Sequence, residues 1–330
     1  MLNSSCTEIV QNAMQQLHSP AKILQNEEDE IMNNLQPSAR EVSIVLGDSP
    51  AALPIKDGRI SAPDLQLNFT QFAKINKAFK PMVRDLAFDV CEMAVVTFLQ
   101  ALAAGKPVRL LPVVLVGKLH HGSLFYDPNN GPLKPEELAG HRVGVRAYSQ
   151  TTGMWVRGIL HEQYGVPLDQ VTWITTEDAH VAEYVNPSNV IKDEGANLVE
   201  MLRTNEVSAI IMGPSQSKGL GLQQLIPDVE AASAAWYDKH HTVPINHMVI
   251  VQEDFLKKDP DAVKEIYDML CKGIDQSRAN AAGSALSAVN YGMDNIWNGG
   301  ALQLAMEYAV DQKLIPRTYS KEEIFVNIPL

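Results

Sequence analysis

The chain has 330 residues, of which 45% are hydrophobic and 20% are charged, which is typical of a folded protein with one or two sizeable cores. Its 27 Lys and Arg against 39 Asp and Glu give a formal net charge of −12, and no basic stripe stands out, so a nucleic-acid partner is not expected. The cysteines Cys6, Cys91 and Cys271 are widely spaced, without a CxxC pair, and indicate neither a disulfide framework nor a zinc site.

The N-terminal region has its own character. Residues 1–40 contain helix-capping residues, Pro20 and periodic apolar residues, and we predict a helical arm that packs on the body or on a second subunit as a homodimer. A regulatory segment is the alternative. The chain has no basic n-region followed by an apolar h-region, and no run of about 18 apolar residues. We therefore expect a cytoplasmic protein with no membrane partner.

From Glu41 onward, short apolar extended segments alternate with helical ones. Strands are predicted at residues 42–46, 60–69, 86–90, 110–116, 123–126, 142–145, 171–174, 209–212 and 248–251. Helices are predicted at residues 95–103, 134–138 and 196–203, after the polar turn 149–152, and through most of the chain beyond Pro260. Such alternation predicts an α/β protein with mostly parallel sheets, whose ligands bind at the carboxyl ends of the strands.

Polar residues follow several of these predicted strands and are expected to converge on one cleft. They are Asp48, Ser49, Glu92, Ser149, Gln150, Thr151, Thr152 and Ser215. The turn before the helix that follows residue 152 also offers free backbone N–H groups, which favour an anion such as a carboxylate. The alternative is that residues 149–152 only cap that helix, that Asp48 only forms a turn, and that Glu92 only stabilises a helix start.

Five segments resemble, in order and spacing, the 4,5-dihydroxyphthalate decarboxylase family. They are GDSPAALPIKDGRI, FDVCEMAVVTFLQALAAGKPVRLLPVV, LHHGSLFY, AGHRVGVRAYSQTTGMWVRGILHEQYGV and PINHMVIVQEDF. The resemblance runs from about residue 41 to the C-terminus. It departs from the family where His120-His121-Gly122 replaces an expected Arg-His-Ser, which exchanges a permanent carboxylate clamp for a titrating group.

The resemblance implies a two-lobed type II periplasmic-binding-protein-like fold, with two mixed sheets flanked by helices. One lobe would comprise residues 41–122 and 246–330, and the other residues 123–245, with the arm outside both. It also implies cofactor-independent decarboxylation of a hydroxylated aromatic acid or diacid, which is the expected small-molecule partner. Because the same scaffold serves receptors, sensors and enzymes, a solute-binding or sensor protein without catalysis is the alternative, and an enzyme acting on a different bond is a third.

Aromatic decarboxylation needs an acid that protonates the ring carbon, a nearby base, and fixed donors for carboxylates. His121 matches the family's histidine and is the first candidate acid, with His120 and His247 as its neighbours. Glu92 and Asp48 are candidate bases. The remaining polar residues named above, together with Arg59 and Arg146, are candidates for holding the substrate.

Each histidine also has a plainer interpretation. His120 and His121 could only line the connection between the lobes and bind backbone carbonyls. A metal held by His120, His121 and His247 is not expected, because neighbours on a strand point to opposite faces. No GxGxxG, P-loop, GxSxG or HExxH motif occurs, and no cofactor is expected.

Overall fold

The structure is a computed structural model that describes residues 39–280 and 288–329. The predicted arm, apart from Ala39 and Arg40, lies outside the described residues, so the arm and the homodimer stay predictions. The chain divides into two compact units. The sites and contacts described below belong to the second unit, whose described residues are 41–62, 67–280 and 288–329.

The first sheet has the strand order β12-β4-β11-β3-β1-β2. Its strands are β1 (Arg40–Val45), β2 (Leu65–Phe69), β3 (Val90–Ala94), β4 (Val108–Gly117), β11 (Ile245–Gln252) and β12 (Asn290–Tyr291). β1 and β3 are parallel, whereas β11 runs antiparallel to both of its neighbours, β3 and β4. All five residues of β3 are buried, as expected for a strand covered on both faces.

The second sheet has the order β10-β5-β9-β6-β7-β8. Its strands are β5 (Leu124–Tyr126), β6 (Arg142–Val145), β7 (Thr172–Thr175), β8 (Val190–Lys192), β9 (Ala209–Ile211) and β10 (Gln223–Gln224). β9, β6, β7 and β8 are parallel neighbours, and β5 is antiparallel to β9. Both sheets are therefore mixed, and the predicted α/β class is confirmed.

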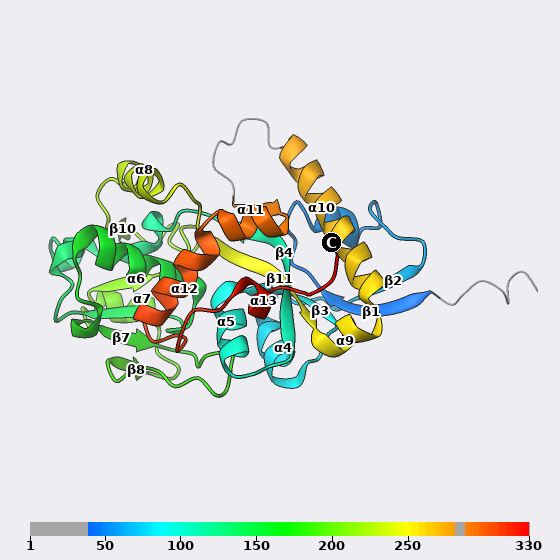
Figure 1. Cartoon of the computed structure of the whole chain (residues 1–330). Helices are drawn as coiled ribbons and strands as arrows, with labels where there is room; N and C mark the ends of the chain where they lie inside the picture. Colours follow the sequence, from blue (N-terminus) through cyan, green and yellow to red (C-terminus); the bar gives the residue numbers. More distant parts are fainter. Residues whose placement is uncertain (1–38, 281–287, 330) are drawn as a thin grey trace, which may run out of the picture. The chain divides into compact units, whose positions relative to one another are not determined.

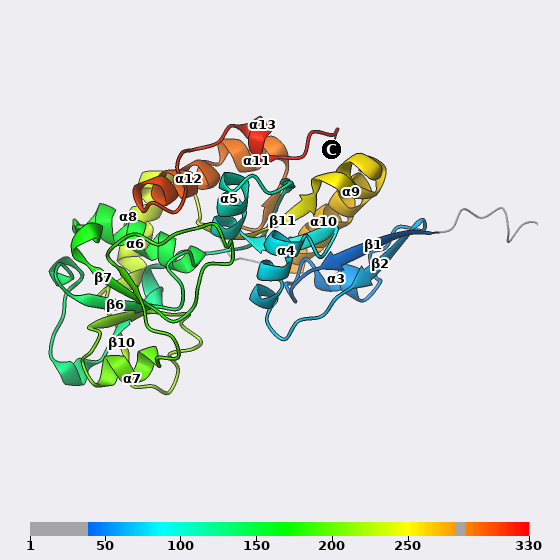
Figure 2. The same ribbon diagram turned by 90° about the horizontal axis from the view of Figure 1, so that it is seen from below.

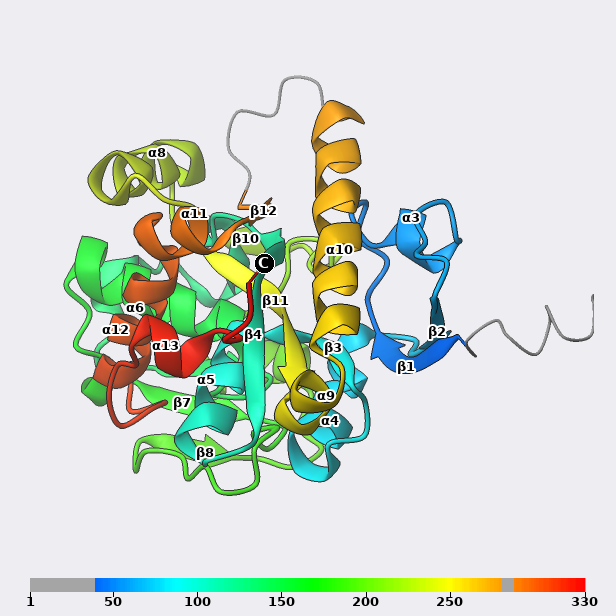
Figure 3. The ribbon, with the colours of Figure 1, turned by 45° about the vertical axis from the view of Figure 1, so that its right-hand side comes forward.

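Helices flank both sheets (Figure 1). The α-helices are α3 (Leu53–Lys56), α4 (Phe79–Asp85), α5 (Val95–Ala103), α6 (Thr151–Tyr164), α7 (Leu198–Arg203), α8 (Val229–His240), α9 (Glu253–Lys258), α10 (Pro260–Asn280), α11 (Met293–Asn298), α12 (Ala301–Asp311) and α13 (Lys321–Ile324). The long helix α10 runs beside α3 and β4 (Figure 3). Among the described residues, no helix is both long and apolar enough to cross a membrane.

Two predicted segments are corrected. The strand predicted at residues 86–90 begins later, as β3 (Val90–Ala94), so Glu92 lies inside a strand and not at a helix start. The short helix predicted at 134–138 is a single 3₁₀ turn, Pro135–Glu137. The first error arises because a short apolar run does not by its periodicity fix a strand boundary. The second arises because a helix-start signal, Pro135 followed by two glutamates, does not set the length of the helix that follows.

The chain passes between the sheets twice, from β4 to β5 and from β10 to β11. The two passages are tied together, because Lys118 N donates to Pro244 O at 3.0 Å and a His120–Asn246 side-chain hydrogen bond of 2.7 Å lies beside it. The strands of each sheet fall within one of the two predicted lobes, apart from two residues: Arg40, the first of β1, precedes both lobes, and Ile245, the first of β11, falls in the other lobe. We keep the division into residues 41–122 with 246–330, and 123–245, as a proposal.

Helices α5, α6 and α12 contact one another and join the two sheets into one hydrophobic core (Figure 2). Trp155 of α6 packs edge-on against Tyr308 of α12, with ring centroids 5.7 Å apart. The fully buried Arg157 donates from Nε to Gln312 Oε1 at 2.7 Å and lies 3.9 Å above the Tyr148 ring. The junction is therefore close-packed, and small changes in side-chain volume there are costly.

A substitution at Gly158 tests this packing. A Cβ atom at Gly158 would lie 2.1 Å from Cδ2 of Tyr308, so we expect Gly158→Ala to lower the free energy of unfolding by about 1–3 kcal/mol. Urea denaturation measures the change. In a double-mutant cycle with Tyr308→Leu, the cost of the alanine should shrink; equal cost in both backgrounds would contradict the contact.

Candidate functional site

A cavity of about 690 Å³ lies where the carboxyl ends of parallel strands β6, β7 and β9 face the 3₁₀ turn at 75–77 and strand β11. The fold predicts a ligand at such strand ends, because the loops that follow them diverge there. The residues that line it are Lys74, Ile75, Asn76, Lys77, Arg146, Gln150, Thr176, Glu177, Ala196, Asn197, Leu198, Val199, Ile211, Met212, Gln216 and His247.

His247 on β11 and Glu92 on β3 form a hydrogen-bonded pair at this cavity. His247 lies opposite Ala94, so Glu92 is its diagonal neighbour on the same face of the sheet, and Nδ1 of His247 is 2.7 Å from Oε1 of Glu92. The other carboxylate oxygen of Glu92 accepts from Gly47 N at 2.8 Å. Since a carboxylate accepts, His247 donates from Nδ1, and Nε2 is the ring nitrogen left for a ligand.

Glu92 is only 1% exposed, so its charge is compensated by these two donors and not by water. His247 keeps a side-chain exposure of 20% because it borders the cavity. Its ring packs edge-on against Phe79 of α4, at a centroid distance of 5.5 Å. Packing and the Glu92 hydrogen bond together hold the imidazole in one orientation.

Three cations line the cavity. Arg146 is paired with Glu177, whose Oε2 lies 2.9 Å from Nη1. Within residues 39–280 and 288–329, neither Lys74 nor Lys77 forms an ion pair, which leaves two positive charges to attract an anion. Sequence reasoning missed both lysines. Their one signal was the spacing Lys74-Ile-Asn-Lys77 in a turn after a strand, which is common on exposed loops.

The four side chains of the polar turn 149–152 have different roles. Gln150 is the N-cap residue of α6 and lines the cavity, and the helix has no side-chain cap. Thr151 Oγ1 accepts from Val96 N of α5 at 3.3 Å, and Thr152 Oγ1 accepts from Asn246 at 3.4 Å. The interpretation that residues 149–152 cap α6 is thus wrong. Ser149 is buried and does not line the cavity.

His120 and His121 lie in a turn that enters the 3₁₀ helix His121–Ser123, not on a strand, and neither lines the cavity. His120 Nε2 bonds Asn246 Oδ1, and burial, opposed by that bond, lowers the pKa of His120 to about 3. His121 Nε2 lies 2.8 Å from Gln163 Oε1, and burial lowers its pKa too. Both histidines bond side-chain amide oxygens through Nε2, so the backbone-carbonyl contacts of the alternative interpretation are not found at these nitrogens.

The candidates on the first sheet's loops also lie elsewhere. Asp48 is an ion-pair partner of Lys56 and borders a separate cavity of about 190 Å³ that shares Lys74 and Ile75 with the larger one. Ser49 accepts from Ala52 N at 3.2 Å and so stabilises a turn.

Two further substrate-binding candidates are outside the cavity lining. Arg59 is mostly exposed and pairs with Asp57 at 2.7 Å. Ser215 is exposed, and the turn after β9 contributes Met212 and Gln216 to the cavity instead. Of the predicted site residues, the structure therefore gathers Glu92, His247, Gln150 and Arg146 at one place.

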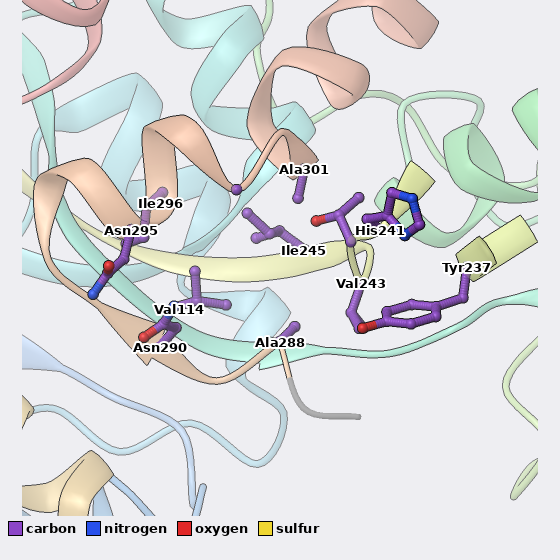
Figure 4. A pocket seen from close by; sticks show the side chains of 12 residues that line it. Val114, Tyr237, His241, Val243, Ile245, Ala288, Asn290, Asn295, Ile296 and Ala301 are labelled. Carbon is purple, nitrogen blue, oxygen red and sulfur yellow. The ribbon is translucent and has the colours of Figure 1, made fainter. Parts of the chain in front are cut away.

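The described residues contain no group of three His, Cys, Asp or Glu side chains arranged to hold a metal. A separate cavity of about 230 Å³ lies along β11, with Tyr237 and His241 at one end and Asn290 and Asn295 at the other (Figure 4). It contains none of the predicted site residues.

His180 was not predicted as a site residue, and it contacts the same Phe79 ring as His247 does. Its Nδ1 is 2.8 Å from Thr97 Oγ1, and its ring packs against Phe79. Burial lowers the pKa of His180 to about 4, with further lowering by the nearby cations Arg146, Lys80, Arg84 and Lys77.

Two curated proteins are similar to this chain in sequence. A 4,5-dihydroxyphthalate decarboxylase from Comamonas testosteroni is 26% identical over 237 residues, covering 68% of this chain and 71% of that protein. A 4,5-dihydroxyphthalate decarboxylase from Pseudomonas putida is 27% identical over 221 residues, covering 63% of this chain and 83% of that protein. The resemblance predicted from the sequence segments is confirmed. No protein-family profile matches the chain.

Solved structures share the fold at low identity. The alkanesulfonate-binding protein SsuA from Xanthomonas axonopodis pv. citri, bound to MOPS, matches with a TM-score of 0.56 and 12% identity, over 88% of this chain and 97% of that chain. The desulfurization enzyme DszB matches with a TM-score of 0.53 and 13% identity, over 86% and 95%. The predicted two-lobed periplasmic-binding-protein-like α/β fold is confirmed.

The low pKa of His180 predicts the direction in which the stability of the fold changes with pH. In the unfolded chain a histidine titrates near about 6.5, so between pH 6.5 and 4 the unfolded state binds a proton that the folded state does not. The free energy of unfolding should fall as the pH drops through this window, by at most about 3 kcal/mol from this group. Above the window, this group should cause no change of stability with pH. Urea denaturation at pH 7 and pH 4.5 should show a smaller loss for His180→Gln than for the wild type.

The exposed histidine variant His161→Gln is the matched control and should follow the wild type. An equal loss in His180→Gln and wild type would show that His180 does not set the acid sensitivity.

Proposed function

We propose that this protein is a decarboxylase of a hydroxylated aromatic dicarboxylate, of the kind named in its curated relatives, and that it works with protein side chains alone. The observation that supports this most is the Glu92–His247 pair in the wall of a cavity with two lysines that have no ion-pair partner in the described chain. Similarity to two 4,5-dihydroxyphthalate decarboxylases supports the reaction type.

In the proposed reaction, His247 is the general acid. Nε2–H of the imidazolium transfers its proton to the ring carbon that bears the carboxylate, and the phenolic oxygen para to that carbon delocalises the positive charge that forms on the ring. The bond from the ring carbon to the carboxylate then breaks. Its electron pair restores the aromatic ring, and CO₂ leaves. Glu92 retains its hydrogen bond to Nδ1 and stabilises the charged imidazolium while keeping the ring oriented.

Charge in the cavity favours a dianion. Lys74 and Lys77 lie on one side, and Arg146 with Gln150 follow β6 on the other. In the proposed arrangement the two adjacent carboxylates of a phthalate lie toward these donors, and the apolar Ile75, Ile211 and Met212 contact the ring face. A volume of about 690 Å³ accommodates one substituted ring with water.

A binding protein without catalysis is the second candidate, because the same fold is found in SsuA, which holds MOPS in its solved structure. A binding protein needs the cations of the cavity but has no use for an oriented acid. The Glu92–His247 pair therefore separates the two candidates experimentally.

We expect His247→Gln to lower kcat for CO₂ release from 4,5-dihydroxyphthalate by about 10²- to 10⁴-fold with little change in KM. Glu92→Gln should lower kcat as well, because it removes the negative charge that stabilises the imidazolium. His121→Gln, which lies outside the cavity, is the matched control and should stay near wild-type activity. Thermal stabilisation by the compound without CO₂ release from the wild type would favour the binding protein. Loss of activity in His121→Gln alone would move the acid to that residue.

Lys77→Ala and Lys74→Ala test the anion site. Each removes one charge of the cavity, so we expect KM to rise by about tenfold and kcat to change less. The effect should shrink at high ionic strength, since the lysines are exposed. Lys134→Ala, an exposed lysine outside the cavity, removes the same net charge and should leave KM unchanged. Steady-state kinetics at low and high salt measure these changes. An equal rise of KM in Lys134→Ala and in the two cavity variants would contradict the anion site.

A further inference from the structure

Arg157 of α6 carries a buried charge that the proposed reaction does not use. The residue is 0% exposed and does not line the larger cavity. Its Nε donates to Gln312 Oε1 and its Nη2 to Tyr148 O, both at 2.7 Å, whereas Nη1 has no hydrogen-bond partner among the described residues. The ring centroids of Tyr148 and Trp173 lie 3.9 Å and 5.3 Å from Cζ. The amide, the backbone carbonyl and the indole among these partners are uncharged.

No carboxylate forms an ion pair with Arg157 in residues 39–280 and 288–329. The ionisable groups that act on it are the phenols of Tyr148 and Tyr184. Burial raises the pKa of Tyr184, so this phenol carries no negative charge at neutral pH. Burial lowers the pKa of Arg157, but a guanidinium titrates at such high pH that it stays protonated in proteins. The interior therefore holds an uncompensated positive charge at this point.

This charge lies on the interior side of the turn that joins β6 to α6. The carbonyl of Tyr148 accepts from Arg157 and stands in the middle of that turn. On either side of Tyr148, the residues Arg146 and Gln150 line the larger cavity. Nη1 also lies 3.1 Å from the position that a Cβ atom would take on Gly153, in the first turn of α6. The guanidinium is thus one layer of backbone behind the cavity wall.

A charge in the interior acts on a ligand without touching it. Coulomb interactions are stronger through protein, with an effective dielectric constant of about 20, than through water. Salt screens a fully buried charge much less than it screens the exposed Lys74 and Lys77. A ligand with two carboxylates gains about twice the interaction energy of a ligand with one, and a neutral ligand gains none.

We propose that Arg157 is a specificity-determining residue of the larger cavity, and that its buried charge makes the cavity selective for an aromatic dicarboxylate over a monocarboxylate or a neutral ring. The hydrogen bond to Tyr148 O holds the charge beside the turn at 146–150. This inference rests on the anion site of the proposed function and extends it, but it does not require that the bound acid loses CO₂.

Isothermal titration of the full-length protein with phthalate, benzoate and benzamide at neutral pH tests the inference without turnover. Gln312→Glu puts a carboxylate at the acceptor of Arg157 Nε, and the guanidinium keeps that carboxylate ionised. The hydrogen bond is kept and the buried charge is compensated. We expect phthalate binding to weaken by about tenfold and benzoate binding by about threefold, with benzamide binding unchanged.

Gln312→Met is the matched control, because it removes the same amide without adding a charge. It should leave the phthalate affinity within about twofold of the wild type. Equal losses in Gln312→Glu and Gln312→Met would overturn the inference and leave Arg157 as a packing residue. Gln170→Glu adds the same charge at an exposed position outside the cavity and should leave all three affinities unchanged. An equal loss in this variant would overturn the inference too, with net charge as the cause.

Arg157→Met is a second variant, since an apolar side chain of similar length often replaces a buried charge without loss of stability. It should weaken phthalate binding as much as Gln312→Glu does, and an unchanged affinity would contradict the proposed role. Raising the salt concentration should shrink the effect of Lys77→Ala but not that of Gln312→Glu. Equal shrinkage of the two effects would also overturn the inference, because a buried charge is not screened in this way.

Failure of the proposed function gives a different result. The wild type would then release no CO₂ from 4,5-dihydroxyphthalate but would still bind phthalate, and Gln312→Glu would still weaken that binding. A wild type that binds no phthalate would overturn the role of Arg157, with or without CO₂ release.

Discussion

The carboxylate of Glu92 is the interaction on which the arrangement of the site depends. It lies inside β3, accepts from Gly47 after β1 and from His247 on β11, and so links three strands of the first sheet. A charge this deeply buried is tolerated only with such partners, and removing either one leaves one carboxylate oxygen without a donor. One carboxylate thereby fixes the loop after β1, the register of β11 beside β3 and the tautomer of the imidazole.

The fold is as suitable for holding a ligand as for transforming it, and the distinction lies in a few side chains. Strand ends of the second sheet supply Arg146, Gln150 and Thr176, which suit recognition of an anion. The first sheet supplies the His247–Glu92 pair, which suits proton transfer. Because α5, α6 and α12 pack both sheets into one core, these two contributions meet at a fixed separation.

Much of this was predictable from the sequence, for reasons that are local. The strand Arg142–Val145 and the helix Val95–Ala103 were predicted with their observed bounds, because apolar runs and flanking breakers mark them. The partners of Glu92 and Thr151 were not predictable, since they come from residues 155 and 55 positions away along the chain. His121 was preferred over His247 because likeness to a family shows which residues match, and only the folded chain shows which face the cavity.

Helix α5 has its two ends in two different environments. Its first turn donates from Val96 N to Thr151, next to the larger cavity, and Gln100 in its last turn donates to Leu314 O, in the segment that follows α12. A helix of nine residues is a stiff rod of about 13 Å, so a displacement along its axis is transmitted from one end to the other with little loss. The turn before α6 and the segment after α12 are consequently held at a set spacing by one short helix.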